Sequence, residues 1–147
     1  MRTRVIDRAA VLAAVLAVTV VAACGGKPDV NVSDSVPRTS LRIAVRAAPD
    51  APPRSATLAC DGAPVATGFI NDAPAACALV TEDQEARAVL VERRPDDRIC
   101  TQLYGGPQQA RVTGRIEGSP VDVTVNRADG CGVADWSRLQ PLLGPPL

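Results

Sequence analysis

The sequence predicts a single α+β domain in which helices cover one face of an antiparallel β-sheet. Residues 41–46 alternate apolar and mostly polar side chains, and residues 110–126 do so twice, on either side of a turn. Such alternation is typical of antiparallel strands with one dry face and one wet face. Helix signals occur near residues 72–77 and 133–139, and these helices are expected over the dry face.

Two strands and a helix are expected in the first half of the domain. The strand over residues 41–46 is stopped by the proline-rich residues 47–53, and a short second strand over residues 55–60 ends at an Asp-Gly pair. Asp72 is a good helix N-cap, so a helix is expected to run from there through Cys77.

The middle of the chain contains one ambiguous segment and one clear hairpin. Charged residues dominate residues 81–98, which fit either a helix or a strand. Residues 110–117 and 121–126 alternate on either side of a Gly-Ser-Pro turn at residues 118–120. The apolar side chains of this hairpin that are expected to face the core are Val112, Ile116, Val121, Val123 and Val125.

Aromatic residues are scarce, so the core must consist mainly of Val, Leu, Ile and Ala. The chain has only Phe69, Tyr104 and Trp136. Trp136 and Leu139 fall on one face of a short helix that ends before Pro141, which predicts that Trp136 points inward. On residue type alone, Tyr104 is also expected in the core.

The N-terminal residues indicate an exported protein. Three arginines within residues 1–8 precede an apolar run over residues 9–21, which is the layout of a secretory signal. This run is shorter than the roughly 20 residues that a transmembrane helix needs. The expected organisation is a removed signal at residues 1–23, a flexible tether at residues 24–39 and one domain at residues 40–147.

A cysteine directly follows the predicted signal. The sequence Val21-Ala22-Ala23-Cys24-Gly25 is similar to the bacterial lipobox, in which the cysteine receives lipid such as palmitate. Each buried methylene contributes about 0.8 kcal/mol, so acyl chains on Cys24 are expected to hold the protein on the extracytoplasmic face of the cell membrane. The alternative is an ordinary secretory signal with an Ala-x-Ala-like cleavage site and an incidental cysteine.

The composition excludes several classes of function. The chain has 16 basic and 16 acidic residues, and removal of the signal, with three Arg and one Asp, leaves 13 basic and 15 acidic. This balance lacks the basic excess of a nucleic-acid-binding protein. Histidine is absent, which excludes Ser-His-Asp and Cys-His catalysis and zinc sites that need imidazole. We therefore expect no enzyme activity, no metal and no cofactor.

Once Cys24 is assigned to lipid, four cysteines remain. They are Cys60, Cys77, Cys100 and Cys131. An even number in an exported domain indicates two disulfides, and the spacing alone allows three pairings. The absence of a C-x-x-C motif argues against a metal knuckle or a redox pair. Two disulfides would each add about 2–4 kcal/mol to the stability of this domain.

Several short segments together carry a family resemblance. In chain order they are ATLAC at 56–60, AAC at 75–77, CTQLY at 100–104, VTGRIEG at 112–118 and DGC at 129–131. The series resembles the Streptomyces subtilisin-inhibitor family, over residues 41–143. That resemblance implies a five-stranded antiparallel sheet with two short helices, the disulfides Cys60–Cys77 and Cys100–Cys131, and commonly a homodimer.

The resemblance also implies an inhibitory loop. Its residues are Ile99, Cys100, Thr101, Gln102, Leu103 and Tyr104. The reactive peptide bond joins Gln102 to Leu103, and the implied partner is a subtilisin-like or trypsin-like serine protease, for which the loop acts as a slow substrate. The family often has proline where this chain has Thr101, and asparagine where it has Asp129. Gln102 is neither basic nor apolar, which leaves the target protease open.

Two functions therefore fit the sequence. The first is a membrane-anchored serine protease inhibitor. The second is a non-inhibitory envelope module that keeps the scaffold and binds another protein or a cell-wall component, as the unusual Gln102 suggests. Without the family resemblance, residues 101–106 fit a disulfide-pinned turn equally well. A protruding loop with Gln102 exposed favours inhibition, whereas burial of Gln102 against the hairpin favours the second function.

Overall fold

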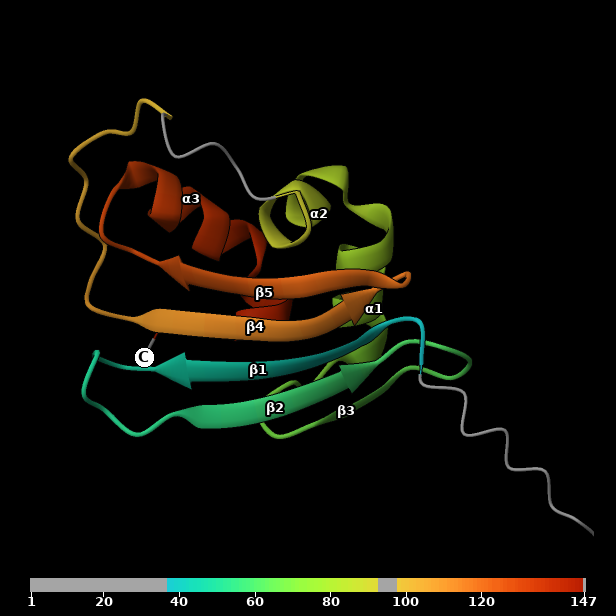
Figure 1. Ribbon diagram of the computed structural model, residues 1–147. Coiled ribbons are helices and arrows are strands. Elements are labelled where there is room, and N and C mark those ends of the chain that lie inside the picture. Colours follow the sequence, from blue (N-terminus) through green and yellow to red (C-terminus); the bar gives the residue numbers. More distant parts are fainter. Residues whose placement is uncertain (1–36, 93–97, 147) are drawn as a thin grey trace, which may run out of the picture. The chain divides into compact units, whose positions relative to one another are not determined.

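The protein has an α+β fold in which helices cover one face of a five-stranded antiparallel sheet, as predicted (Figure 1). The structure, a computed structural model, describes residues 37–92 and 98–146. The signal, Cys24 and most of the predicted tether lie outside these ranges. In the described part the strand order is β3-β2-β1-β4-β5.

Strand β1 (Ser40–Arg46) lies at the centre of the sheet. It pairs with β2 (Arg54–Ala59) on one side and with β4 (Gln109–Ile116) on the other. Its alternating pattern buries Leu41, Ile43 and Val45 against the helices, as the sequence predicts. The short edge strand β3 (Val65–Thr67) pairs with β2 and was not expected from the sequence pattern.

The predicted hairpin is confirmed, but its turn lies earlier than expected. Strand β5 (Ser119–Asn126) starts directly after the two-residue turn Glu117–Gly118, whose φ angles of 49° and 85° are both positive. Two positive φ angles are typical of the tight turn whose twist matches that of a β-hairpin. Pro120 therefore lies within a strand, and β5 accommodates it because β5 is an edge strand.

The predicted helix after Asp72 is longer than expected. Asp72 is the N-cap of helix α1 (Ala73–Glu82), and its side chain accepts a hydrogen bond from the backbone N–H of Ala75. Helix α2 (Gln84–Leu90) follows after the single residue Asp83. The ambiguous segment 81–98 is thus helical as far as Leu90.

The C-terminal helix is also divided. Helix α3 (Gly130–Arg138) and helix α4 (Gln140–Leu143) meet at Leu139, and Pro141 stands in the first turn of α4, where its missing N–H costs nothing. The described residues therefore contain four short helices where the resemblance implied two, because each helical region is interrupted once.

The core is aliphatic and contains one aromatic side chain. Trp136 is 1% exposed, and Val112, Ile116, Val121 and Val125 are buried as predicted, with Val123 half-buried against them. The expectation that Tyr104 belongs to the core is wrong, because 63% of Tyr104 is exposed. The described strands, helices and disulfides all belong to one compact unit, residues 35–147, which has its own hydrophobic core, as a domain does.

Both disulfides join the pairs that the resemblance implied. Cys60–Cys77 connects the end of β2 to α1, and Cys100–Cys131 connects the segment before β4 to the first turn of α3. None of the helices in the described ranges has the length and apolar character needed to cross a membrane.

Candidate functional site

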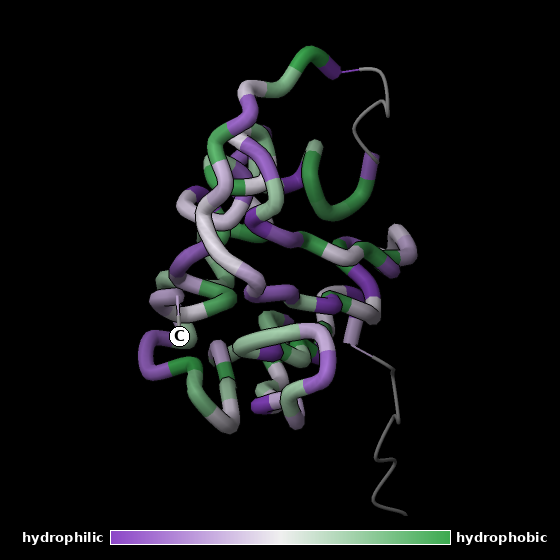
Figure 2. The backbone as a smooth tube through the Cα atoms, turned by 90° about the vertical axis from the view of Figure 1, so that its left-hand side faces the viewer, coloured by the Kyte–Doolittle hydropathy of each residue, from purple (hydrophilic) through white to green (hydrophobic). Residues whose placement is uncertain are grey.

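The six predicted loop residues lie in an open segment at one end of the sheet. Residues 98–106 contain no helix, strand or turn and lead into β4. This segment runs along the outside of α3, in yellow-orange at the upper left of Figure 1. Seen from the side, the segment that follows the grey trace at the top forms an outer arch of the molecule (Figure 2).

The loop exposes large apolar side chains. Ile99 is 101% exposed, Leu103 is 58% exposed and Tyr104 is 63% exposed, while Thr101 and Gln102 are also exposed. In the described part of the chain only one other large apolar side chain, Val65, is similarly exposed. Such a group of solvent-facing apolar residues is typical of a surface that contacts a partner.

Two backbone hydrogen bonds hold the loop on either side of the exposed residues 102–104. Before them, the carbonyl of Thr101 accepts a hydrogen bond from the N–H of Gly130 at 2.9 Å. After them, the N–H of Gly105 donates to the carbonyl of Arg127 at 2.8 Å. Both supporting groups belong to residues 127–130, which run from the end of β5 to the first residue of α3, so one support holds both ends of the exposed segment.

The Cys100–Cys131 disulfide anchors the loop to the same support. Its Cα atoms lie 5.4 Å apart, and Cys131 is the residue after Gly130. The start of the segment is also held by an ion pair, in which Nη2 of Arg98 lies 3.1 Å from Oδ2 of Asp135, a buried side chain of α3. Two backbone hydrogen bonds, one disulfide and one ion pair therefore hold the loop, while its exposed side chains face the solvent.

Two glycines allow the loop to lie this close to its support. A Cβ atom at Gly130 would lie 2.0 Å from Oγ1 of Thr101, and one at Gly105 would lie 2.4 Å from Cγ2 of Val133. Contacts below 3 Å are not tolerated without displacement. The sequence analysis assigned no role to Gly105, Gly130 or Arg127. The two glycines have one local signal, which is a loop cysteine nearby in the sequence, and Arg127 has none.

The hydrogen bond of the Asp129 side chain shows its structural role. Its Oδ1 accepts from the N–H of Gly132 at 2.8 Å, so Asp129 caps the N-terminus of α3. It thereby fixes the start of the helix whose first residue, Gly130, holds Thr101. Its support of the loop is therefore indirect.

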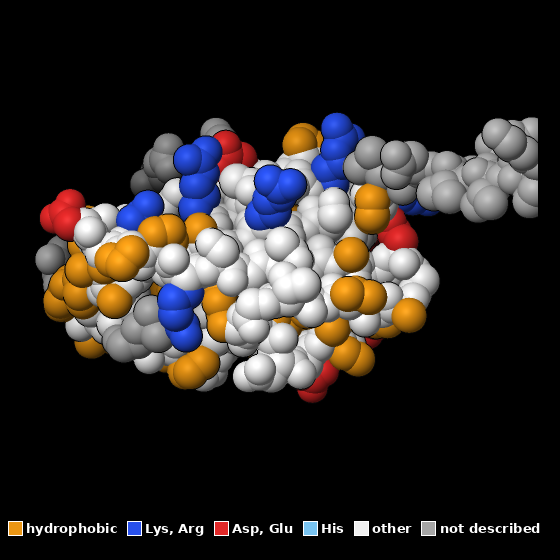
Figure 3. Space-filling view, turned by 90° about the horizontal axis from the view of Figure 1, so that it is seen from below, with side chains coloured by type: hydrophobic (Ala, Val, Ile, Leu, Met, Phe, Trp, Pro, Cys, Tyr) orange, Lys and Arg blue, Asp and Glu red, His pale blue; other side chains and the backbone are white. Residues whose placement is uncertain are grey.

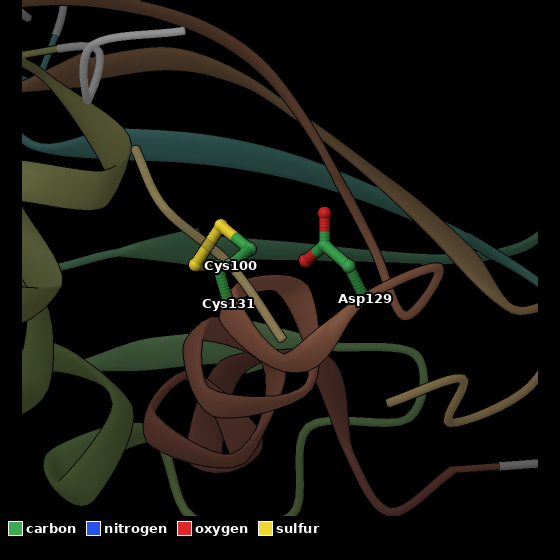
Figure 4. A group of neighbouring side chains, drawn as sticks. All are labelled: Cys100, Asp129 and Cys131. Carbon is green, nitrogen blue, oxygen red and sulfur yellow. A yellow bond between two sulfur atoms is a disulfide. The ribbon is translucent and has the colours of Figure 1, made fainter. Parts of the chain in front are cut away.

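Cys100, Asp129 and Cys131 also lie close enough together to resemble a metal site. Figure 4 shows the two sulfur atoms bonded to each other, with the carboxylate of Asp129 beside them. A disulfide offers no thiolate to a metal ion. The group is therefore a cross-link beside a helix cap.

No protein-family model matches the chain, and no curated protein matches it at a significant level.

Proposed function

We propose that this protein is a reversible serine protease inhibitor of the subtilisin-inhibitor type, which presents the Gln102–Leu103 bond to its target. The observation that carries the proposal is the exposed segment 102–104 held at both ends by backbone hydrogen bonds to one support. A protease binds its substrate in one conformation, and a loop held in advance avoids an ordering cost of about 0.5–1.5 kcal/mol per side chain.

The same contacts explain why the loop would resist digestion. When the protease serine attacks the Gln102 carbonyl, the bond to Leu103 breaks and Leu103 becomes the leaving amine. The Gly105–Arg127 hydrogen bond keeps this amine beside the acyl-enzyme, and the Thr101–Gly130 hydrogen bond with the Cys100–Cys131 disulfide holds the acyl side. The amine can then attack the acyl-enzyme and reform the bond faster than it departs.

Titration of subtilisin and trypsin with the oxidised domain, residues 35–147, tests the proposal. Gln102→Lys should bind trypsin more tightly than the natural sequence does, because a trypsin-like pocket contains an aspartate that pairs with a basic residue. Gln84→Lys is the matched control, since Gln84 is an exposed glutamine at the start of α2.

The natural domain is expected to inhibit at least one of the two enzymes, and Gln84→Lys should behave as the natural domain does. Absence of inhibition by every form, together with no gain toward trypsin from Gln102→Lys, contradicts the proposal. A gain from Gln84→Lys equal to that from Gln102→Lys would also contradict it, because the effect would then come from net charge.

We further propose that lipid on Cys24 anchors this inhibitor to the extracytoplasmic face of the cell membrane, with residues 24–39 as the tether. The support is the lipobox-like sequence at residues 21–25. Expressed in a bacterium, the natural chain should partition into the detergent phase on Triton X-114 extraction, and Cys24→Ser should remain in the aqueous phase. If the natural chain is recovered cleaved before Cys24 and its mass shows no added acyl group, the proposed lipid anchor is wrong.

A further inference from the structure

The face of the sheet that the helices leave open is rich in arginine. Register places Arg42, Arg46, Arg111 and Arg115 on this open face, which is opposite to the buried side chains of β1 and β4. Among the described residues, its one carboxylate is Asp122. The described chain as a whole is nearly balanced, with ten arginines and eleven carboxylates. In Figure 3 arginine side chains rise along the upper side, which is the open face.

A groove of about 310 Å³ crosses the middle of this open face. It forms because Ala44 has a short side chain and stands between Ser55 on β2 and Arg111 on β4. Arg42 and Arg111 line the groove, together with Ser55, Thr57 and Thr113 and the apolar residues Ile43, Ala44 and Ala56. The lining therefore contains two arginines and three hydroxyl-bearing residues, and the groove is large enough for a small polar group.

The arginines of the groove differ in their existing partners. Arg111 donates two hydrogen bonds to Asp122, at 3.1 and 3.0 Å, and these bonds together with the charge of Asp122 raise the pKa of Arg111. For Arg42 and Arg115, no carboxylate of residues 37–92 or 98–146 lies within ion-pair distance. Arg42 and Arg115 are thus exposed cations available to an external anion, while Arg111 is held in place.

We propose that the open face is a second membrane contact, in which Arg42 and Arg111 bind the phosphate of an anionic phospholipid headgroup and Arg115 lies near neighbouring headgroups. Guanidinium groups pair well with phosphate oxygens, and a negatively charged leaflet attracts clustered arginines. The inference does not depend on the inhibitory loop. A lipid on Cys24 would strengthen the contact by raising the local concentration of the domain.

The charge of the open face favours the membrane over other occupants. Two copies packed face to face would bring the arginines of both sheets together, with only one Asp122 on each to offset them. A typical protein interface has an apolar centre. Here two arginines line the groove at the centre, and the exposed Val65 lies on the edge strand β3.

The test uses the oxidised, unlipidated domain, residues 35–147, in co-sedimentation with vesicles at low and high salt. Binding is expected to phosphatidylglycerol–phosphatidylcholine vesicles at low salt, with little binding to pure phosphatidylcholine or at high salt. Arg42→Gln with Arg115→Gln should weaken binding about fivefold per arginine, or about 25-fold together. Inorganic phosphate is added separately as a soluble anion, and ultracentrifugation reports the oligomeric state.

The matched control is Arg54→Gln with Arg138→Gln, which has the same net charge. Arg54 pairs with Val45 in the sheet register and so points to the opposite side from Arg42, and Arg138 lies in α3. The control pair should bind within about twofold of the natural domain. Circular dichroism verifies that every variant is folded.

Three results would overturn the proposal. One is equal weakening by the face variant and the control, which would mean that only net charge matters. Another is tight binding of inorganic phosphate without binding to anionic vesicles. The third is a dimer that the face variant dissociates, with no vesicle binding, which would assign the open face to a second copy of the chain.

Discussion

Gly130 is the residue at which the loop and α3 come closest. Its N–H holds the Thr101 carbonyl, and its missing side chain leaves room for the Thr101 hydroxyl. The residue therefore contributes one hydrogen bond and the space for one side chain, both on the acyl side of the proposed reactive bond. Nothing in the local sequence Asp129-Gly130-Cys131 indicates which side chain will fill that space.

Gly130→Ala is expected to weaken inhibition by roughly tenfold while leaving the domain folded, because the new Cβ displaces Thr101 and the loop is no longer held in advance. The measurement is the inhibition constant against whichever protease the natural domain inhibits. Adding Thr101→Ala should restore much of the loss, since it removes the hydroxyl that the new methyl group meets. Failure of this rescue would mean that Gly130→Ala acts through the helix and not through the loop.

At the scale of elements, Asp83 is a single residue that contacts three helices. It ends α1, and its side chain starts α2 by accepting a hydrogen bond from the N–H of Ala86 at 2.9 Å. The carboxylate also lies 3.6 Å from Arg138 of α3. One residue thus ends one helix, caps the next and contacts a third, which keeps the helices together over the sheet.

Asp83→Ala is expected to lower the free energy of unfolding by about 1 kcal/mol, the usual cost of losing an N-cap. The ion pair with Arg138 is partly exposed and should add little. Urea unfolding followed by circular dichroism measures the change. Glu82→Ala removes the neighbouring exposed carboxylate and should change stability by less than about 0.5 kcal/mol, as surface substitutions usually do. Equal effects would show that the cap is unimportant.

At the scale of the whole domain, the two disulfides connect different parts of the fold. Cys60–Cys77 ties α1 to the sheet far from the loop in sequence, whereas Cys100–Cys131 ties the loop to its support. They close segments with sequence separations of 17 and 31. By loop-closure entropy each should stabilise the domain by about 3–4 kcal/mol.

Replacing either pair by serine should therefore lower stability by a similar amount, measured by urea unfolding. Only Cys100→Ser with Cys131→Ser should also weaken inhibition, because of the two disulfides only this one holds the acyl side of the proposed reactive bond. Cys60→Ser with Cys77→Ser is the matched control. Equal loss of inhibition in the two variants, measured where both are folded, would show that Cys100–Cys131 has no special role in the loop.

Several features followed from the sequence by itself. The alternating segments predicted β1, β2, β4 and β5, and the inward positions of the hairpin, because the period of a half-buried strand is local and visible in any short window. The cap at Asp72 and the inward Trp136 followed from equally local signals. The number of cysteines predicted two cross-links, while the resemblance supplied their pairing.

Only the tertiary structure decided the remainder. The edge strand β3, the helix at residues 84–90, and the exposure of Tyr104 depend on which segments meet, and local pattern does not carry that information. The support of the loop by Gly130 and Arg127, and the alignment of Arg42 with Arg111 around a groove, are contacts between residues far apart in the chain. They exist only once strand register and the chain path are set, and the sequence does not display them in advance.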